Sequence, residues 1–267
     1  MQQRLLLSTA LVLLVAGCRP KADLVRTSAD PATTLSQQSV DAVLYQYASA
    51  EVHRLYQQGY ELARIKLDAN LAQPRELPPA VVVDVDETVL DNSPYQAMLA
   101  REGRTYSADT WTSWCNKANA KALPGAVAFL QYAASKGCTV FYITNRLPAE
   151  KDGTVRNLVK EGFPFADAEH VMVMEGTSDK TVRRAAVSAK HAVVLFIGDQ
   201  LTDIDQSFKD RKEGEGKPFV DRSNEMLSRS FVLLPNPMYG TWLDAICGRP
   251  DSVKAGNKER YLRNVPY

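Results

Sequence analysis

The sequence lacks the features that mark a protein that coats nucleic acid or one that spans a membrane. Its 267 residues carry 32 basic and 31 acidic side chains without a basic cluster, so we expect no binding of a nucleic-acid polymer. An apolar run at residues 5–16 is shorter than the roughly 20 residues that a transmembrane helix needs. No internal repeat is present. With 45% hydrophobic residues, the chain is instead suited to one sizeable globular core.

Histidine and cysteine are also scarce. The three histidines lie far apart in the chain without the spacing of metal ligands, and no two cysteines form a C-x-x-C pair. Besides Cys18, three cysteines remain, namely Cys115, Cys138 and Cys247. They allow at most one disulfide within the chain, and their pairing stays open. We expect structural roles for both residue types.

The amino terminus has the pattern of a secretory signal that ends at a cysteine. Arg4 precedes the apolar run, and the segment LVAGC ends at Cys18, which resembles the lipobox of bacterial lipoproteins. We predict a signal peptide over residues 1–17, lipidation of Cys18 and a flexible tether over residues 18–38. Arg19 favours the outer membrane, by resemblance to enteric sorting rules. The expected protein is an outer-membrane lipoprotein of the bacterial cell envelope that faces the periplasm; an ordinary secretory signal containing a cysteine is the alternative.

The remaining chain, residues 39–267, is predicted to form one α/β domain with a doubly wound parallel sheet. Amphipathic segments such as 125–136 and 179–190 separate most of the short apolar runs, and strands that alternate with helices are typical of this fold class. The predicted buried strands span residues 80–84, 139–144, 170–174, 192–198 and 230–234.

Helices are predicted on either side of these strands. A helix is expected over residues 40–71, and residues 92–123, with parts of both termini, are expected to form a small, mostly helical cap lobe. Residues 235–267 are interpreted as irregular. The apolar residues that recur near helical spacing in the first segment are Leu44, Tyr47, Ala48, Leu55, Leu62 and Ile65.

The first predicted strand ends in two carboxylates two residues apart. Asp84 and Asp86 follow a run of β-branched residues, and residues i and i+2 of a strand point to one face. Two like charges held this close repel each other unless a cation joins them or one carboxylate keeps a proton. The pair therefore indicates chemistry rather than structure.

Polar residues also follow the other predicted strands, where ligands of such sheets bind. Thr144 and Asn145 follow the second strand, and Lys180 opens the helix after the third; these three are predicted to hold phosphate by hydrogen bonds and charge. Asp199 and Asp203 follow the fourth strand. Mg²⁺ prefers such oxygen ligands together with substrate phosphate.

These strand ends resemble the four motifs of the haloacid dehalogenase (HAD) superfamily, and the chain is more similar still to its class C acid phosphatases, the outer-membrane lipoprotein type. The similarity runs from about Leu44 to Ile246. It is carried in order by DETVLDNSPY (86–95), TWTSW (110–114), LPGAV (123–127), FYITNR (141–146), DKTVRR (179–184) and LPNPMYG (234–240).

The resemblance implies a Mg²⁺-dependent acid phosphatase, that is, a phosphoric monoester hydrolase. Asp84 would be the nucleophile and Asp86 the general acid and base. The metal would be held by Asp84, the backbone carbonyl of Asp86 and Asp199, with Asp203 supporting its waters. Gln200 departs from the family, in which Asn usually follows the motif-four aspartate, and Ile204 departs where an aromatic residue often stands.

The expected substrates are small phosphomonoesters, with nucleoside 5′-monophosphates and aryl phosphates favoured by the resemblance. The alternatives are a phosphotransferase of the same fold and a non-catalytic ligand-binding lipoprotein, and a homodimer stays open. An EF-hand over residues 84–95 is excluded, because the glycine and glutamate that its loop requires are absent. Aromatic residues that line a substrate slot or pack the cap are Tyr95, Trp111, Trp114 and Tyr239.

Overall fold

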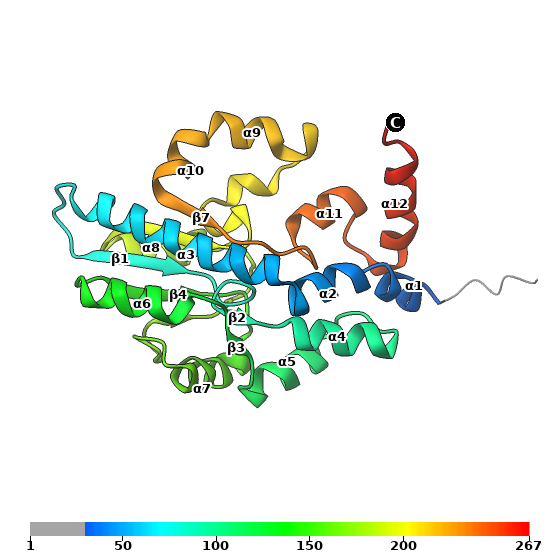
Figure 1. Ribbon diagram of the computed structural model, residues 1–267, viewed down its shortest axis with the longest axis horizontal. Helices are drawn as coiled ribbons and strands as arrows, with labels where there is room; N and C mark the ends of the chain where they lie inside the picture. Colours follow the sequence, from blue (N-terminus) through cyan, green and yellow to red (C-terminus); the bar gives the residue numbers. More distant parts are fainter. Residues whose placement is uncertain (1–29, 267) are drawn as a thin grey trace, which may run out of the picture.

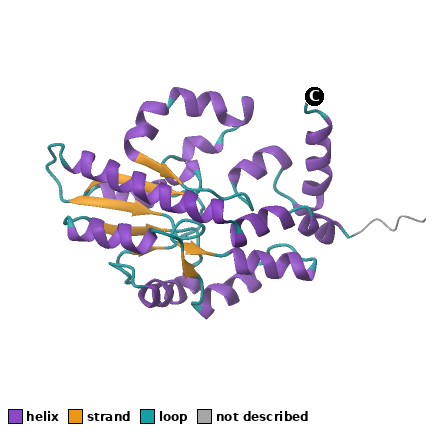
Figure 2. Cartoon of the chain, in the orientation of Figure 1, coloured by secondary structure: helices purple, strands orange, loops and turns teal. Residues whose placement is uncertain are grey.

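The computed structural model describes residues 30–266, and the predictions for the signal peptide, Cys18 and most of the tether lie outside this range. Within it, a parallel five-stranded sheet has the strand order β5-β4-β1-β6-β7, with helices on both faces (Figures 1 and 2). The predicted doubly wound α/β fold is therefore confirmed. The strands are β1 (Pro79–Val83), β4 (Thr139–Ile143), β5 (Val171–Met172), β6 (Ala192–Gly198) and β7 (Phe231–Leu233).

Strand β1 lies at the point where the strand order reverses. The chain adds β4 and β5 on one side of β1, and then β6 and β7 on the other. Val83, the last residue of β1, pairs with Tyr142 of β4 and with Ile197 of β6. The residues that follow these three strands thus meet at one edge of the sheet, which is the usual ligand position in this fold.

The two faces of the sheet are covered by different helices. Val81 and Val83 point into the larger core, with helices α3 (Ala50–Leu71) and α6 (Ala126–Ser135), whereas Ala80 and Val82 pack with Val187 of α8 (Thr181–Ser188). Because successive strand residues face opposite sides, a continuous apolar run such as residues 80–83 is what a strand buried on both faces requires. Burial of this run makes β1 the most enclosed strand and a rigid base for the residue that follows it.

The helix predicted over residues 40–71 is present as α2 (Val40–Ala48) and α3, but the predicted apolar face is not the buried one. Leu44, Tyr47, Leu55, Leu62 and Ile65 are exposed, and so is Ala48. The buried face was missed because two of its members are tyrosines, whose hydroxyl groups reach backbone carbonyls at the site. It consists of Val52, Tyr56, Tyr60, Ala63 and Leu67.

A cap lobe lies beside the carboxyl ends of the strands (Figure 1). Its helices α4 (Ser93–Glu102) and α5 (Ala108–Lys117) lie between two short antiparallel strands, β2 (Leu90–Asp91) and β3 (Lys121–Ala122). Helix α4 contacts α2 and also α1 (Pro31–Gln37) from the amino-terminal end, and α1 contacts α12 (Asp251–Arg263). The amino-terminal helices therefore pack against α4, and α12 packs against α1.

Two predictions for the terminal segments are wrong. Residues 31–37 fall within the predicted tether, yet they form α1, with Asp30 as N-cap, and bury Leu35 and Ser36. The Ser36 hydroxyl donates to the backbone carbonyl of Leu99 at 3.2 Å. Residues 235–267 were interpreted as irregular, but they contain α11 (Thr241–Cys247) and α12; α12 has only one buried residue, Ala255, so its sequence has too weak an apolar periodicity to reveal a helix.

The remaining elements complete the layers around the sheet. They are α7 (Lys151–Glu161), α9 (Lys217–Arg222) and α10 (Asn224–Ser230), with four short 3-10 segments. Over residues 30–266, no helix combines the length and the apolar composition that crossing a membrane requires. Cys115, Cys138 and Cys247 are all buried and unpaired, in agreement with structural roles.

Candidate active site

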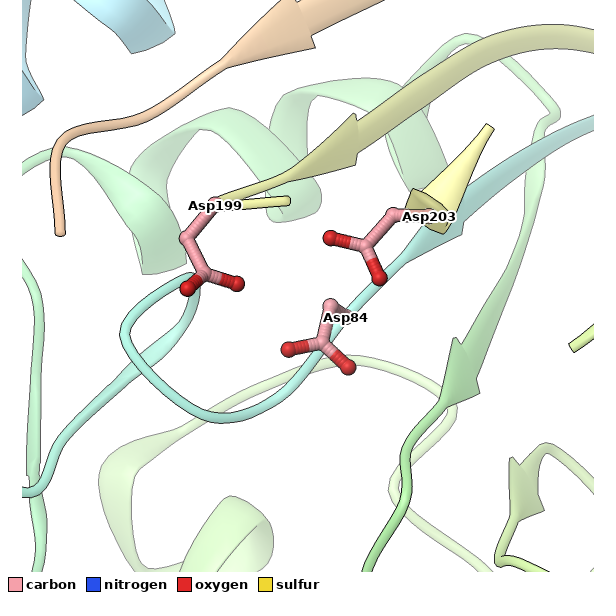
Figure 3. A group of neighbouring side chains, drawn as sticks. All are labelled: Asp84, Asp199 and Asp203. Atoms are coloured by element: carbon pink, nitrogen blue, oxygen red, sulfur yellow. The ribbon is translucent and has the colours of Figure 1, made fainter. Parts of the chain in front are cut away.

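Three carboxylates from the ends of β1 and β6 form an acid cluster. Asp84 directly follows β1, Asp199 directly follows β6, and Asp203 lies in the next turn. One oxygen from each lies within 4.8 Å of the others, and Figure 3 shows the three side chains turned toward a common centre. The register of β1 and β6 produces this meeting, because Val83, the last residue of β1, pairs with Ile197, one residue before the end of β6. The cluster opens into a cavity of about 740 Å³.

Lys180 lies within hydrogen-bonding distance of two members of the acid cluster. Its ammonium group donates to Asp84 and, at 2.7 Å, to Asp203, and the side chain is 5% exposed. Lys180 stands at the N-cap position of α8, the helix that packs on Ala80 and Val82. The start of this helix lies near the ends of the strands, which is how the Lys180 side chain reaches Asp84 and Asp203. One lysine thus joins the carboxylates that follow β1 and β6.

Asp86 has a cation of its own, Arg146. The guanidinium donates to Oδ1 of Asp86 from Nε at 3.0 Å and from Nη2 at 2.8 Å, and the Arg146 side chain is only 1% exposed. Arg146 is held in turn by Thr154, which accepts from Nη1 at 3.1 Å. The sequence predicted that a cation or a proton must separate Asp84 from Asp86; in the structure each carboxylate is paired with a different cationic side chain.

Burial and mutual repulsion shift the pKa values in the acid cluster. Burial raises the pKa of Asp84 well above its ordinary value; Lys180 opposes this shift, and the charges of Asp203 and Asp199 add to it. Burial, followed by the charge of Asp203, raises the pKa of Asp199 to about 7. Burial alone would lower the pKa of Lys180, but the carboxylates of Asp203 and Asp84 outweigh it and the pKa is raised. Lys180 therefore stays charged while the carboxylates compete for too little positive charge.

The residues present fit a hard divalent cation. The donor set consists of carboxylate oxygens, the ligands that Mg²⁺ prefers, and no histidine or cysteine belongs to it. Four carboxylates, counting Asp86, face two cationic side chains, so two negative charges are uncompensated when all four are ionised. Asp199 has one oxygen, Oδ2, that accepts from Gln200 and Asn236, which leaves its other oxygen available.

Two buried tyrosines of α3 donate hydrogen bonds to the backbone of the loop between Asp84 and β2. The Tyr56 hydroxyl donates to the backbone carbonyl of Glu87 at 3.0 Å, and the Tyr60 hydroxyl donates to that of Thr88 at 2.7 Å. Glu87 has a φ of 55°, a left-handed conformation that is uncommon for a residue with a side chain. Burial raises the pKa of the Glu87 carboxyl well above its usual value. These contacts fix the turn that follows Asp86.

The predicted phosphate-binding residues differ in their position relative to the cavity. Asn145 and Lys180 line it, together with Asp84, Asp86, Asp199 and Asp203. Thr144 is fully buried; its hydroxyl lies 3.3 Å from Oδ2 of Asp86 and accepts from the backbone N–H of Arg146. Thr144 is therefore placed where it contacts Asp86 rather than the open cavity.

The four predicted aromatic residues also separate into two groups. Trp111 and Tyr239 line the cavity, from the cap and from the loop before α11 respectively. Tyr95 is 1% exposed and packs edge to face against Trp111, with ring centroids 5.1 Å apart. The Trp114 indole donates to Oδ1 of Asn92 at 2.8 Å. Tyr95 and Trp114 thus support the wall that Trp111 presents to the cavity.

Sequence reasoning missed two contributors to the cavity. One is Arg146, for which the sequence predicts no role; a basic residue two positions after a strand-end threonine is the available signal. Tyr106 lies in the cap, lines the cavity and is 58% exposed, with its ring 6.3 Å from that of Trp111. Nothing in its local sequence distinguishes it from a surface tyrosine.

Comparison with known proteins agrees with this geometry. A family model described as HAD superfamily, subfamily IIIB (acid phosphatase), matches residues 5–242. The solved structure of the class C acid phosphatase from Bacillus anthracis is 39% identical, covers 88% of this chain and 99% of its own, and superposes with a TM-score of 0.80. A tungstate-bound crystal structure of that phosphatase superposes with a TM-score of 0.81.

More distant relatives have similar names. Acid phosphatase 1 of Solanum lycopersicum is 29% identical over 167 residues, which are 59% of this chain and 57% of that protein. The class B acid phosphatase of Morganella morganii is 27% identical over 136 residues, or 48% of this chain and 57% of its own. The match therefore spans little more than half the length of these curated relatives. The family model and the solved structures cover most of the chain, and the protein belongs to the HAD subfamily IIIB acid phosphatases, with a structure like that of the class C enzymes.

Proposed function

We propose that the protein is a Mg²⁺-dependent acid phosphatase that hydrolyses small phosphomonoesters through a covalent phosphoryl-Asp84 intermediate. The observation that carries this proposal is the position of Asp84, buried at the switch point of the sheet, bonded to Lys180 and within 4.8 Å of two further carboxylates. A buried carboxylate in such surroundings is costly to keep ionised. Lys180 lowers this cost, and a bound cation would lower it further, so that Asp84 could be ionised when it attacks an anionic substrate.

The proposed reaction has two steps. In the first, a carboxylate oxygen of Asp84 attacks phosphorus, the bond between phosphorus and the ester oxygen breaks, and Asp86 gives its proton to the departing alcohol. In the second, Asp86 takes a proton from water as the water oxygen attacks phosphorus, which releases inorganic phosphate and restores the Asp84 carboxylate. Arg146 holds Asp86 through Oδ1, so we assign proton transfer to its other oxygen, Oδ2, which lies 3.3 Å from the Thr144 hydroxyl.

Asp84, Asp199 and the backbone carbonyl of Asp86 would hold the cation, with Asp203 beside them. When bound, Mg²⁺ would neutralise charge on the phosphoryl group and on the attacking carboxylate. Lys180 keeps its positive charge next to Asp84 and Asp203, and it would also balance the phosphoryl oxygens. Asn145 lines the cavity and is held by Arg183, which donates to its Oδ1 at 2.8 Å; its amide nitrogen would donate to the substrate.

The cavity supports a substrate larger than phosphate alone. Its volume is about 740 Å³, within the range of sites that hold drug-sized ligands. Trp111, Tyr106 and Tyr239 line it along with polar groups, and aromatic faces suit the organic part of an aryl phosphate or a nucleoside 5′-monophosphate. We favour these two substrate classes.

The proposed location adds a membrane tether. The segment before residue 30 has the lipobox-like LVAGC, and we propose that Cys18 carries the lipid and holds the enzyme at the outer membrane, facing the periplasm. Cys18→Ser should abolish labelling by a radioactive or clickable fatty acid in cells. Labelling that persists in this variant would refute the assignment.

Replacing Asp84 tests the proposed function. Asp84→Asn should lower kcat for 4-nitrophenyl phosphate at least about a thousandfold, because an amide is not a nucleophile here and is a weak ligand for magnesium. Asp109→Asn, an exposed change on α5, serves as the matched control and should keep full activity. Appreciable turnover by Asp84→Asn would exclude the covalent mechanism. Transfer of phosphate to an added alcohol, in place of hydrolysis, would indicate a phosphotransferase.

A further inference from the structure

The side-chain amide of Gln200 joins the acid cluster to the start of α11. Its Nε2 donates to Oδ2 of Asp199 at 2.7 Å. Its Oε1 accepts from the backbone N–H of Thr241 at 2.9 Å and from the Thr241 hydroxyl at 3.0 Å. The amide thus uses its donor on the carboxylate and its acceptor on the loop, and this division allows only one orientation of the amide.

Asn236 makes a second link of the same kind. Its Nδ2 donates to the same oxygen of Asp199 at 2.8 Å, and its Oδ1 accepts from the backbone N–H of Met238 at 3.0 Å and of Tyr239 at 3.4 Å. Two amides therefore connect one carboxylate oxygen of the acid cluster to residues 236–241. This segment, which we call the bridge loop, carries the cavity-lining Tyr239.

The bridge loop fits closely around the Gln200 side chain. Gly240 has a φ of 139°, and a Cβ at this position would lie 2.7 Å from the amide carbon of Gln200, so a side chain cannot be added there without displacing the amide. An Asn at position 200, the residue usual in the family, is one methylene shorter and could not reach both Asp199 and Thr241 in this arrangement. Position 200 is thus matched to the bridge loop of this chain.

We propose that Gln200 and Asn236 are positioning residues that couple cation binding at Asp199 to the position of the bridge loop. The inference rests on the proposed function, in which Asp199 is a ligand of the cation. With Oδ2 occupied by two amide donors, the carboxylate presents its other oxygen to the cation. A rotation of the carboxylate on cation binding moves both amides, and the amides move the cavity wall at Tyr239.

The chain contains a reporter for this movement. The indole of Trp242 donates to the backbone carbonyl of Tyr239 at 3.2 Å, so its environment depends on the bridge loop. The other two tryptophans, Trp111 and Trp114, lie on α5 in the cap. Labelling with 5-fluorotryptophan should give three ¹⁹F resonances, and the Trp242 resonance is assigned by its loss in Trp242→Phe.

The test is a Mg²⁺ titration of the labelled full chain, followed by ¹⁹F NMR and in parallel by calorimetry. In the native protein, the Trp242 resonance should shift with the same midpoint as the heat of Mg²⁺ binding. Gln200→Leu keeps the volume of the side chain but none of these hydrogen bonds, so in this variant Asp199 is no longer linked to Thr241 through position 200. The Trp242 shift at saturating Mg²⁺ should be smaller than in the native protein.

Two further variants complete the design. Thr241→Val removes the hydroxyl that donates to Gln200 but keeps the backbone N–H that does so. It should therefore give a Trp242 shift between those of the native protein and Gln200→Leu. It replaces Gln200→Leu if circular dichroism shows that Gln200→Leu does not fold. Gln96→Leu removes another cavity-lining amide, which lies on the cap side in α4, and should leave the response unchanged.

The outcomes are distinguishable. A Trp242 resonance that does not respond to saturating Mg²⁺ in the native protein, or that shifts as far in Gln200→Leu as in the native protein, overturns the coupling and leaves the proposed phosphatase intact. An absence of Mg²⁺ binding in the native protein, with no heat at two temperatures and no ¹⁹F response, refutes the proposed metal and the coupling together.

Discussion

The raised pKa of Asp199 predicts that the folded protein without metal is destabilised by its own acid cluster. The pKa of this carboxyl rises from 3.8 to about 7, chiefly through burial and then through the charge of Asp203. Asp199→Asn removes the ionisation. The amide oxygen can still accept from Gln200 and Asn236, and the amide nitrogen would face the remaining carboxylates. The variant should therefore be more stable than the native protein wherever Asp199 is ionised.

Proton linkage gives the direction and the size of the change in the free energy of unfolding with pH. Below the unfolded pKa of 3.8, the carboxyl is protonated in both states and contributes nothing; between 3.8 and about 7 only the unfolded state loses its proton, so stability falls as pH rises. One pKa unit corresponds to about 1.4 kcal/mol. The total cost of ionising Asp199 in the folded protein is therefore about 4 kcal/mol above its folded pKa, of which about 2 to 3 kcal/mol appears between pH 5 and pH 8.

The assay is urea unfolding followed by circular dichroism, with chelator present, near pH 5 and near pH 8. The free energy of unfolding of Asp199→Asn should exceed that of the native protein by a margin that widens by about 2 to 3 kcal/mol from the lower to the higher pH. Added Mg²⁺ should reduce this margin near pH 8, because a ligand that binds only the folded state stabilises it. A margin that is constant or narrows with pH would show that Asp199 is not held in a repulsive, buried cluster.

Three further changes test other parts of the site. Arg146→Lys replaces the two-pronged contact with Asp86. In steady-state assays it should lower kcat about a hundredfold for an alkyl phosphate and much less for 4-nitrophenyl phosphate, whose leaving group needs little protonation. Equal losses of kcat on both substrates would contradict the role given to Asp86. Tyr56→Phe removes the hydroxyl that supports Glu87, and urea titration should show a loss of about 1 to 2 kcal/mol. Gly198→Ala would place a Cβ 2.5 Å from a side-chain carbon of the acid cluster, so Mg²⁺ binding measured by calorimetry should be lost, and unchanged binding would show that the cluster can move aside.

Much of the fold could be predicted because the central strands are buried on both faces. The runs of residues 80–83 and 192–197 are continuously apolar, and the strands that contain them begin within one residue of their predicted starts. The acid cluster could be predicted for a related reason. Asp84 and Asp199 directly follow strands, Asp203 lies in the turn after Asp199, and Lys180 precedes a helix; parallel strands place such residues at one edge.

What could not be predicted depends on contacts between segments far apart in the chain. The pairing of Arg146 with Asp86 requires the register of β1 against β4, which no local pattern specifies. The buried face of α3 was misassigned because Tyr56 and Tyr60 combine an apolar ring with a hydroxyl that needs a partner, and those partners are backbone carbonyls of the loop after β1. Helix α12 lacks a pronounced apolar stripe, since it buries only Ala255.

The Gln200 departure has a comparable explanation. In the sequence it is one of two expected departures from the family pattern, next to an aspartate that is expected to bind metal. In the structure its longer side chain reaches Thr241, forty-one positions later in the chain. A local motif therefore shows that position 200 differs, and only the tertiary structure shows what the added methylene contacts.

The most direct test of the central claim is a rapid-quench experiment on Asp86→Asn with 4-nitrophenyl phosphate. The good leaving group lets Asp84 be phosphorylated without an acid, whereas the missing base slows hydrolysis of the intermediate. We predict a burst of nitrophenol equal to the concentration of enzyme, and a peptide containing Asp84 that is heavier by one phosphoryl group in mass spectrometry. No burst, or a phosphoryl group on any other residue, would contradict Asp84 as the nucleophile.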